Sequence, residues 1–242
     1  MTLINLDSVD STNTYLKTLC QVKNCLDFTT VVAKIQTKGK GQRGSHWYSE
    51  PRKNLTFSIL KHTDQMPLRE QFHLSMAVSL GVLEALSLWV PQGLSIKWPN
   101  DIMLGDKKIG GILIENIVQG QLWKYAIIGI GINVNQTDFS LLPKATSLAM
   151  GNGKMIDKEQ LLDQFRLSVE EQLTADKVKS FGLIKSSYVK KLYRFNLSSK
   201  FETTEGKLFE AVITDLTPDG QLVLSTSGKI KSYDLKTLKM IY

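Results

Sequence analysis

The sequence predicts an α+β fold, in which a mostly antiparallel sheet has its helices packed on one side and a small all-β domain follows. Residues 68–90 carry the longest helical pattern, with apolar side chains recurring every three or four positions. Residues 94–134 hold short strands in quick succession, whereas a doubly wound fold would alternate strands and helices regularly. Residues 196–242 consist of strands and turns, and their six lysines balance six acidic residues, so the net charge changes at this point of the chain. We therefore expect one domain at 1–195 and a second at 196–242.

The individual elements follow from local patterns. Asp10 or Ser11 is a suitable N-cap for a helix that reaches about Lys23. Pro91 and Gly93 end the long helix at 68–90. Strands are expected at 3–6, 28–34, 54–61, 94–97, 102–104, 108–117 and 123–134, and in the tail at 200–204, 207–216, 221–225 and 229–234. A second helical region is expected at 158–195, with a break near Gly182, and a Gly-rich basic loop at 35–53.

Composition excludes several classes of protein. The chain has 242 residues, of which 42% are apolar, so it can bury a sizeable core without disulfides or metals. No apolar run approaches the roughly 18–20 residues of a membrane helix, and the first residues do not resemble a secretory signal. Cys20 and Cys25 are too few for a disulfide framework, which predicts free thiols in a reducing cytoplasm.

The net charge of +7 is concentrated in two segments. Residues 34–61 contain seven Lys or Arg against Glu50 alone, a balance of +6, and residues 177–194 contain six and no acid, again +6. Such surfaces suit nucleic acid, an acidic protein partner or a phosphate-bearing ligand. The second segment either forms a solvated helix face or attracts an acidic partner protein.

The basic loop has a glycine pattern that does not fit a dinucleotide site. Gly39–Gly44 matches G-x-G-x-x-G, but the residues after it do not open the apolar helix that would meet a phosphate. Its variable positions are Lys40, Gln42 and Arg43. The pattern indicates a loop of donors that closes on an anion, with a solvated basic hairpin as the alternative.

Three later segments add glycines, amides and charges. In 97–101, Trp98 precedes a proline, an amide and a carboxylate, which suits a base or a magnesium ion as well as an ordinary turn. In 106–115 and 129–135, glycines interrupt apolar strands, which indicates close approach of a ligand or of another element. The histidines show no metal spacing, and no activated nucleophile is evident. These residue types suit a reaction whose substrates supply the nucleophile while the protein supplies position and charge.

Taken in order, these segments resemble the motifs of biotin protein ligases, in the short form without an N-terminal DNA-binding domain. The matching stretches are Asp7–Asn13, Gln36–Trp47, Lys97–Asp101, Lys107–Glu115 and Gly129–Asn133. The resemblance implies a class II synthetase-like catalytic domain and an SH3-like C-terminal domain. It also implies the activity of a biotin–[acetyl-CoA-carboxylase] ligase: biotin and ATP give biotinyl-5'-AMP and pyrophosphate, and the biotinyl group then passes to a lysine of a biotin carboxyl carrier domain.

The resemblance also assigns roles to residues. Biotin would be held by Ser11, Thr12, Asn13, Gln36, Lys40, Gly41, Gln42, Lys108, Gly110 and Gly111. The charges that assist catalysis would come from Lys108, Lys40 and Arg43. The nucleotide would be contacted by Trp47, Asn100 and Asn133, and Mg²⁺ would be organised by Asp101. Many family members have Arg where this chain has Lys40 and Gln42, so the loop loses a bidentate fork and one charge.

Three other functions stay open at this point. One is a non-catalytic biotin-binding protein, which is disfavoured because the nucleotide-contacting positions are matched as well. A lipoate–protein ligase shares the fold, but its Arg-Arg-x-Ser-Gly-Gly-Gly pattern is missing. A basic nucleic-acid-binding module would need aromatic residues among the charges, and Trp47 and Tyr48 supply some. For partners, we expect a carrier protein, biotin and ATP, without a membrane and without sequence-specific DNA binding, since the first motif begins at Asp7. The family resemblance allows a homodimer formed through sheet edges.

Overall fold

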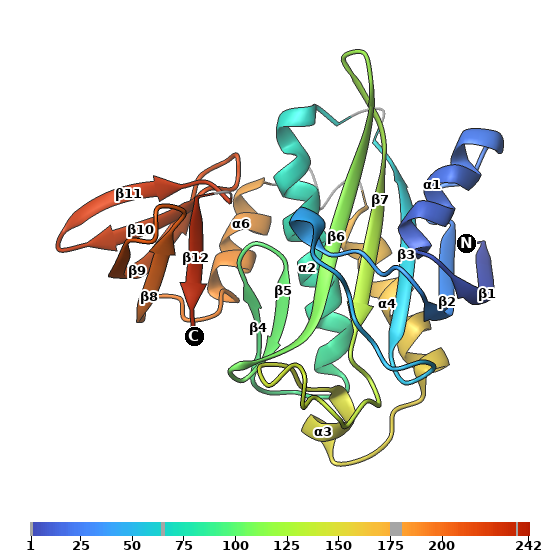
Figure 1. Cartoon of the computed structure of the whole chain (residues 1–242). Coiled ribbons are helices and arrows are strands. Elements are labelled where there is room, and N and C mark those ends of the chain that lie inside the picture. The colour runs from blue at the N-terminus through green and yellow to red at the C-terminus, as the bar shows by residue number, and fades with distance from the viewer. Residues whose placement is uncertain (1, 64–65, 175–180, 236) are drawn as a thin grey trace.

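A large central sheet and a smaller C-terminal sheet organise the structure (Figure 1). The computed structural model describes residues 2–63, 66–174, 181–235 and 237–242, without the side chain of Arg43. Among the described residues, the central strands run in the order β1-β2-β3-β7-β6-β5-β4, with bounds β1 Leu3–Val9, β2 Thr30–Gln36, β3 Leu55–His62, β4 Leu94–Lys97, β5 Asp101–Leu104, β6 Lys107–Gln119 and β7 Leu122–Ile132. Of the pairings between these described strands, only that of β1 with β2 is parallel. The predicted α+β class with a mostly antiparallel sheet is confirmed.

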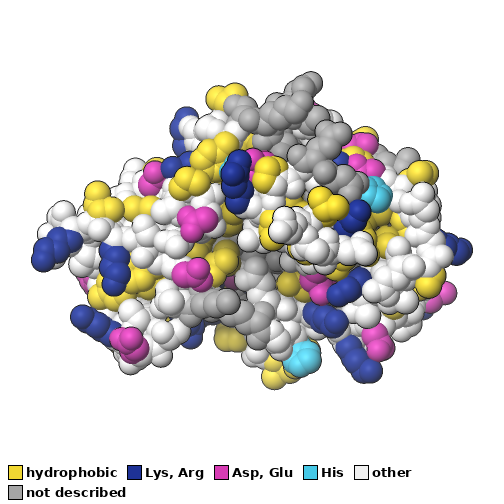
Figure 2. All heavy atoms as spheres, turned by 90° about the horizontal axis from the view of Figure 1, so that it is seen from above, with side chains coloured by type: hydrophobic (Ala, Val, Ile, Leu, Met, Phe, Trp, Pro, Cys, Tyr) yellow, Lys and Arg dark blue, Asp and Glu magenta, His cyan; other side chains and the backbone are white. Residues whose placement is uncertain are grey.

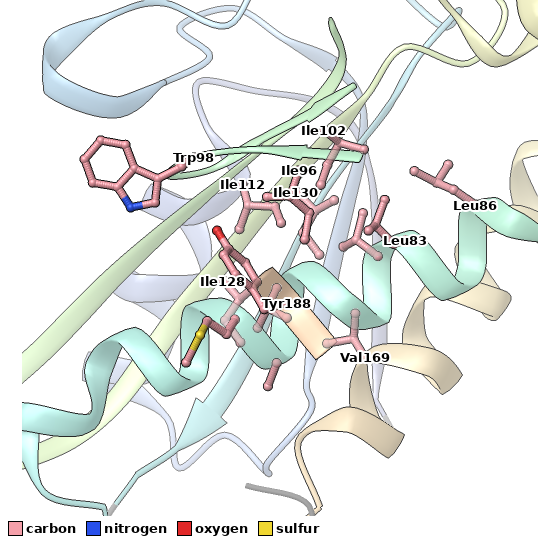
Figure 3. Packing of buried hydrophobic residues seen from close by; sticks show 14 of the residues in the cluster. Leu83, Leu86, Ile96, Trp98, Ile102, Ile112, Ile128, Ile130, Val169 and Tyr188 are labelled. Carbon is pink, nitrogen blue, oxygen red and sulfur yellow. The ribbon is translucent and has the colours of Figure 1, made fainter. Parts of the chain in front are cut away.

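Two long helices cover one face of this sheet. They are α2 (Gln71–Ser87) and α4 (Lys158–Gln172), and α6 (Phe181–Lys190) packs against α2. Strand side chains alternate between faces, so Ile128 and Ile130 of β7 point the same way, toward Leu83 of α2 and Val169 of α4 (Figure 3). This layer forms the larger hydrophobic core. None of the described helices is long and apolar enough to cross a membrane.

Helix α1 (Thr12–Val22) is an exception to the expected grouping of helices on one side. Its Leu16 packs on Leu60 of β3 and Ile127 of β7, in a second cluster apart from the main core. Leu60 and Ile127 alternate with residues of the main core, so they lie on the opposite face of the sheet. The sequence pattern missed this because both faces of β3 are buried, and its run of apolar residues does not tell one face from the other.

The C-terminal sheet has one strand more than the four predicted. Among the described residues its order is β11-β10-β9-β8-β12, with bounds β8 Ser198–Thr203, β9 Leu208–Leu216, β10 Leu222–Thr226, β11 Lys229–Tyr233 and β12 Leu238–Ile241. The short β12 pairs with β8, a partner far back in the chain, so local patterns do not reveal it. Trp98 Nε1 donates to the Gly220 carbonyl at 3.0 Å and Lys185 pairs with Asp215 at 2.8 Å, which fastens this sheet to the rest.

The second helical region is interrupted near Gly182, as expected. Helix α4 ends at Gln172 and α6 begins at Phe181, so Gly182 itself is the second residue of α6. A helical glycine costs only about 1 kcal/mol, which the burial of Ile184 and Tyr188 on the same helix outweighs. The sequence pattern also missed the short helix α3 (Leu148–Asn152) and the 3-10 turns η1 (Gln42–Gly44) and η2 (Leu68–Glu70).

The two basic segments are less free than their sequence suggests. In the first, three lysines pair with aspartates from outside the segment: Lys34 with Asp7 at 2.8 Å, Lys38 with Asp10 at 3.1 Å and Lys61 with Asp27 at 2.5 Å. In the second, residues 177–180 lie outside the described residues, and Lys185 is paired as noted above. The face in Figure 2 shows basic side chains interspersed with acidic and apolar ones. These ion pairs reduce the positive electrostatic potential that would attract a nucleic acid.

Candidate active site

A pocket of about 250 Å³ lies on the α1 face of the central sheet. We call it the central pocket. Its floor is made by β6 and β7, its walls by the start of α1 and the end of β2, and its cover by the loop that contains η1. The loop closes on itself, because the Gly41 N–H donates to the Ser45 carbonyl at 2.7 Å and the Trp47 N–H to the Gly39 carbonyl at 3.0 Å.

Glycines create the space above the floor. Ile127 fills its face of β7, but the next two residues on that face are Gly129 and Gly131. A Cβ at Gly129 would lie 2.4 Å from Asn13 Oδ1, and one at Gly131 would lie 2.6 Å from Trp47 Cε2. Any larger residue would displace these two side chains, which explains the glycines in an otherwise apolar strand.

Side-chain hydrogen bonds fix one end of the pocket. Gln36 Oε1 accepts from the Thr12 N–H at 2.8 Å and from Thr12 Oγ1 at 3.1 Å. Asn13 Nδ2 donates to Glu115 Oε2 at 2.7 Å, and its Oδ1 lies 2.6 Å from the Ser58 hydroxyl, which donates to it. Thr12, Asn13 and Ser58 are almost completely buried. This end therefore presents neutral donors and acceptors in fixed orientations, which we call the amide end.

Lysines define the other end. Lys108 Nζ lies 2.5 Å from Asp101 Oδ1, and Lys97 Nζ lies 3.0 Å from Asp101 Oδ2. Strand pairing explains the contact, since Asp101 of β5 sits opposite Gly111 of β6, beside Lys108. Burial favours protonation of Asp101 and is the largest single effect, but Lys108 and Lys97 together outweigh it and hold the pKa of this carboxyl below its usual range. The Asp101 carboxylate thus stays ionised and holds two ammonium groups. We call the end of the pocket formed by Lys97, Asp101 and Lys108 the lysine end.

The loop brings two more groups to the pocket. Lys40 Nζ donates to Thr14 Oγ1 at 2.9 Å, which places its charge over the start of α1. The Trp47 ring stands on the floor at Gly131, and Lys108 Nζ lies 5.8 Å from the ring centroid. Trp47 Nε1 is buried and has no hydrogen-bond partner among the described residues. Trp89 and Trp123, which do not line the pocket, have the same kind of unpartnered indole N–H.

The structure brings most of the predicted site residues together. Those that line the central pocket are Ser11, Thr12, Asn13, Gln36, Lys40, Gly41, Gln42, Trp47, Asn100, Asp101, Lys108 and Gly111. Of the other three, Gly110 and Asn133 do not line it within the described residues. Gly110 lies on the face covered by α2, where its Cβ would be 2.5 Å from Ile132 Cδ1. Asn133 is buried and donates to the Thr146 carbonyl at 3.0 Å, and the side chain of Arg43 lies outside the described part.

Sequence reasoning did not assign three residues that position the site. Ser58 and Glu115 hold the Asn13 amide, and Lys97 neutralises Asp101. Ser58 carried a usable signal, because it is one of two small polar residues, with Thr56, in the buried run of β3. Glu115 and Lys97 are revealed only when the register of the strands is known.

The donor set does not fit a magnesium ion held by the protein. Both oxygens of Asp101 are engaged by lysines, and the described residues contain no cluster of three acidic, His or Cys side chains. Magnesium takes six oxygen ligands in a nearly octahedral arrangement. In this structure Asp101 is the counter-ion of Lys108 and Lys97, and its predicted role in organising a Mg²⁺ ion that enters with ATP stays a prediction.

Known proteins share this fold and these motifs. The family described as "Biotin/lipoate A/B protein ligase family" matches residues 6–133. The bifunctional ligase/repressor BirA of Bacillus spizizenii is 30% identical over 233 residues, which are 95% of this chain and 71% of that protein. The biotin–[acetyl-CoA-carboxylase] ligase of Mycobacterium tuberculosis is 24% identical over 207 residues, covering 84% of this chain and 76% of that protein.

Solved structures extend the match beyond the motifs. The biotin protein ligase from Aquifex aeolicus in complex with biotin and ATP superposes with a TM-score of 0.82 at 30% identity, over 99% of both chains. The match therefore includes the C-terminal sheet as well as the central pocket. The resemblance inferred from the motifs is confirmed, and the chain belongs to the biotin/lipoate A/B protein ligase family.

Proposed function

We propose that this chain is an ATP-dependent biotin protein ligase. It would join biotin to the α-phosphate of ATP with release of pyrophosphate, and then transfer the biotinyl group to a lysine of a biotin carboxyl carrier domain. The observation that carries this proposal is one pocket with a neutral amide end and a cationic lysine end, in a chain that matches a biotin- and ATP-bound ligase along almost its whole length.

The amide end suits the ring of biotin. The ring is a neutral cyclic urea with one carbonyl oxygen and two N–H groups, and it needs donors and acceptors rather than charges. Thr12, Asn13 and Gln36 line the pocket with such groups, and Ser58 holds the Asn13 amide in its orientation. A site built to satisfy these groups rejects a ring that lacks them, because buried polar groups would be left unpaired. Lipoate has a disulfide ring without amides, so this end favours biotin over the lipoate alternative.

The lysine end suits the first chemical step. The biotin carboxylate attacks the α-phosphorus, a P–O bond to pyrophosphate breaks, and negative charge grows on the phosphate oxygens. Lys108 sits at this end with its ammonium directed into the pocket, and Lys40 approaches from the loop. The protein needs no nucleophile of its own, because its contribution is position and charge. Mg²⁺ would enter with the ATP phosphates.

The loop suits protection of the mixed anhydride. Residues 40–47 of the loop help to line the pocket, and Trp47 among them has a flat ring of the kind on which a nucleotide base stacks. Covering the anhydride keeps water away until the acceptor amine arrives. Since Gln42 is neutral and Lys40 lacks the fork of an arginine, retention of the intermediate would depend mainly on Lys40, Arg43 and Lys108.

Several expectations about partners stay predictions. They are the acidic carrier attracted by 177–194, the homodimer through sheet edges, the absence of sequence-specific DNA binding, and the cytoplasmic location. The pairing of Lys185 with Asp215 leaves fewer free charges for the first of these. Chemical crosslinking and a gel shift with operator DNA would test the second and third.

The proposal is tested by labelling a purified carrier domain with biotin. We expect labelling that requires both biotin and ATP, with lipoate as the substrate control. Lys108→Ala should lose labelling, whereas Lys107→Ala, at the exposed neighbouring position, should keep it. Labelling with lipoate in place of biotin, or labelling without ATP, would overturn the proposal.

A further inference from the structure

The lysine end is in contact with the last residue of the chain. Two lysines outside the C-terminal sheet lie over the Tyr242 ring, with Lys97 Nζ 4.6 Å and Lys144 Nζ 4.7 Å from its centroid. Lys144 Nζ also donates to a main-chain oxygen of Tyr242. The edge of Tyr193 meets the same ring, with 5.8 Å between centroids. The Tyr242 side chain is thus held on several sides, although it follows the small C-terminal sheet.

These contacts continue to the lysine that faces the substrate. Lys97, which rests on the Tyr242 ring, is the second partner of Asp101, and Asp101 is the partner of Lys108. The Lys97 and Asp101 side chains are only 17% and 16% exposed, so solvent compensates their charges poorly. The backbone adds a second link, because the Lys108 N–H donates to the Lys144 carbonyl at 2.8 Å.

We propose that Tyr242 is a positioning residue for biotin activation, which holds Lys97 on Asp101 so that Lys108 can turn from Asp101 to the reacting phosphate. The inference rests on the proposed function.

The physical reason is charge balance. In the structure one carboxylate serves two ammonium groups. When Lys108 leaves Asp101 for the substrate, the carboxylate keeps only Lys97 as a partner, so its charge is compensated only if Lys97 stays in place. A cation over an aromatic face is stabilised in that position, so the lysine side chain samples few others. A lysine side chain without such a contact samples many positions. Without the ring, Asp101 would hold Lys108 back or repel the incoming anion.

The chain offers matched variants at this position. Tyr242→Phe keeps the ring and removes the hydroxyl, which makes no hydrogen bond among the described residues. Tyr242→Leu keeps apolar bulk but removes the aromatic face. Both are compared with the wild-type full chain, and thermal melting confirms that each variant is folded.

The first measurement needs no substrate. The ring current of Tyr242 should shift the NMR signals of the Lys97 side-chain methylene next to the ammonium upfield. We expect the shift in wild type and Tyr242→Phe, and its loss in Tyr242→Leu. An unshifted Lys97 signal in the wild type would overturn the proposal, whatever the activity.

The second measurement is biotin-dependent pyrophosphate release. We expect kcat to fall about three- to tenfold in Tyr242→Leu, the scale of one cation–π contact at about 1.4 kcal/mol per tenfold, with the KM for biotin unchanged within twofold. Tyr242→Phe should match the wild type. A wild-type kcat in folded Tyr242→Leu, or an equal loss in Tyr242→Phe, would overturn the positioning role while the proposed function stands. A wild-type chain that releases no pyrophosphate with biotin would overturn both.

Discussion

Replacing Gly129 with alanine is expected to damage the amide end of the pocket. The new Cβ would lie 2.4 Å from Asn13 Oδ1, whereas ordinary contact begins at 3.4 Å, so the Asn13 amide must move by about 1 Å (3.4 − 2.4). That shift would take Asn13 Nδ2 out of hydrogen-bond range of Glu115, now 2.7 Å away. Losing a hydrogen bond to a charged group costs about 1.5–3 kcal/mol, which corresponds to about a 10- to 150-fold loss in kcat/KM for biotin.

The assay is biotin-dependent pyrophosphate release at varied biotin concentration, with thermal melting to confirm folding. Gly182→Ala is the matched control, because its Cβ would meet nothing within 4 Å on helix α6. It should keep wild-type kinetics and gain about 0.5–1 kcal/mol of stability. A folded Gly129→Ala protein with wild-type kcat/KM for biotin would refute the role given to Asn13.

Three further predictions test the lysine end and the attachment of the C-terminal sheet. Lys108→Ala should lose biotinyl-AMP formation by at least about 2 kcal/mol, or about 30-fold, measured as pyrophosphate release, and wild-type release would contradict this. The pKa of Asp101 is lowered in the fold, so the stability that its charge supplies is fully present above about pH 4 and is lost as the pH falls through the lowered pKa. The difference in the free energy of unfolding between wild type and Asp101→Asn should therefore shrink in acid. A difference that does not change with pH would contradict the ion pairs. Trp98→Phe leaves the Gly220 carbonyl without its donor and should lower the free energy of unfolding by about 1–3 kcal/mol, as measured in urea; an unchanged midpoint would show that this bond contributes nothing.

The sequence supports good predictions where one local signal dominates. The strand predicted at 94–97 is observed at Leu94–Lys97. Of the two predicted N-cap candidates for the first helix, Ser11 is the observed N-cap of α1. The long helix is shorter than predicted, because its first turn is the 3-10 turn η2 and it ends at Ser87. Element type thus followed from periodicity, whereas the ends depended on packing.

Strand register explains what the sequence left out of the site. Gly110 and Gly111 are adjacent in the chain but lie on opposite faces of β6, so only one of them lines the pocket. Glu115 reaches Asn13 from more than a hundred positions away in the chain. Such contacts depend on which strand pairs with which, and no local pattern of residues contains that information.

The central claim is that the pocket activates biotin with ATP, and pyrophosphate exchange into ATP tests it without any carrier protein. Labelled pyrophosphate is incubated with the wild-type chain, ATP and Mg²⁺, with biotin, with lipoate, or with neither. We predict exchange only with biotin, and its loss in Lys108→Ala. Exchange with lipoate but not biotin, or no exchange with either acid in a folded protein, would contradict the account.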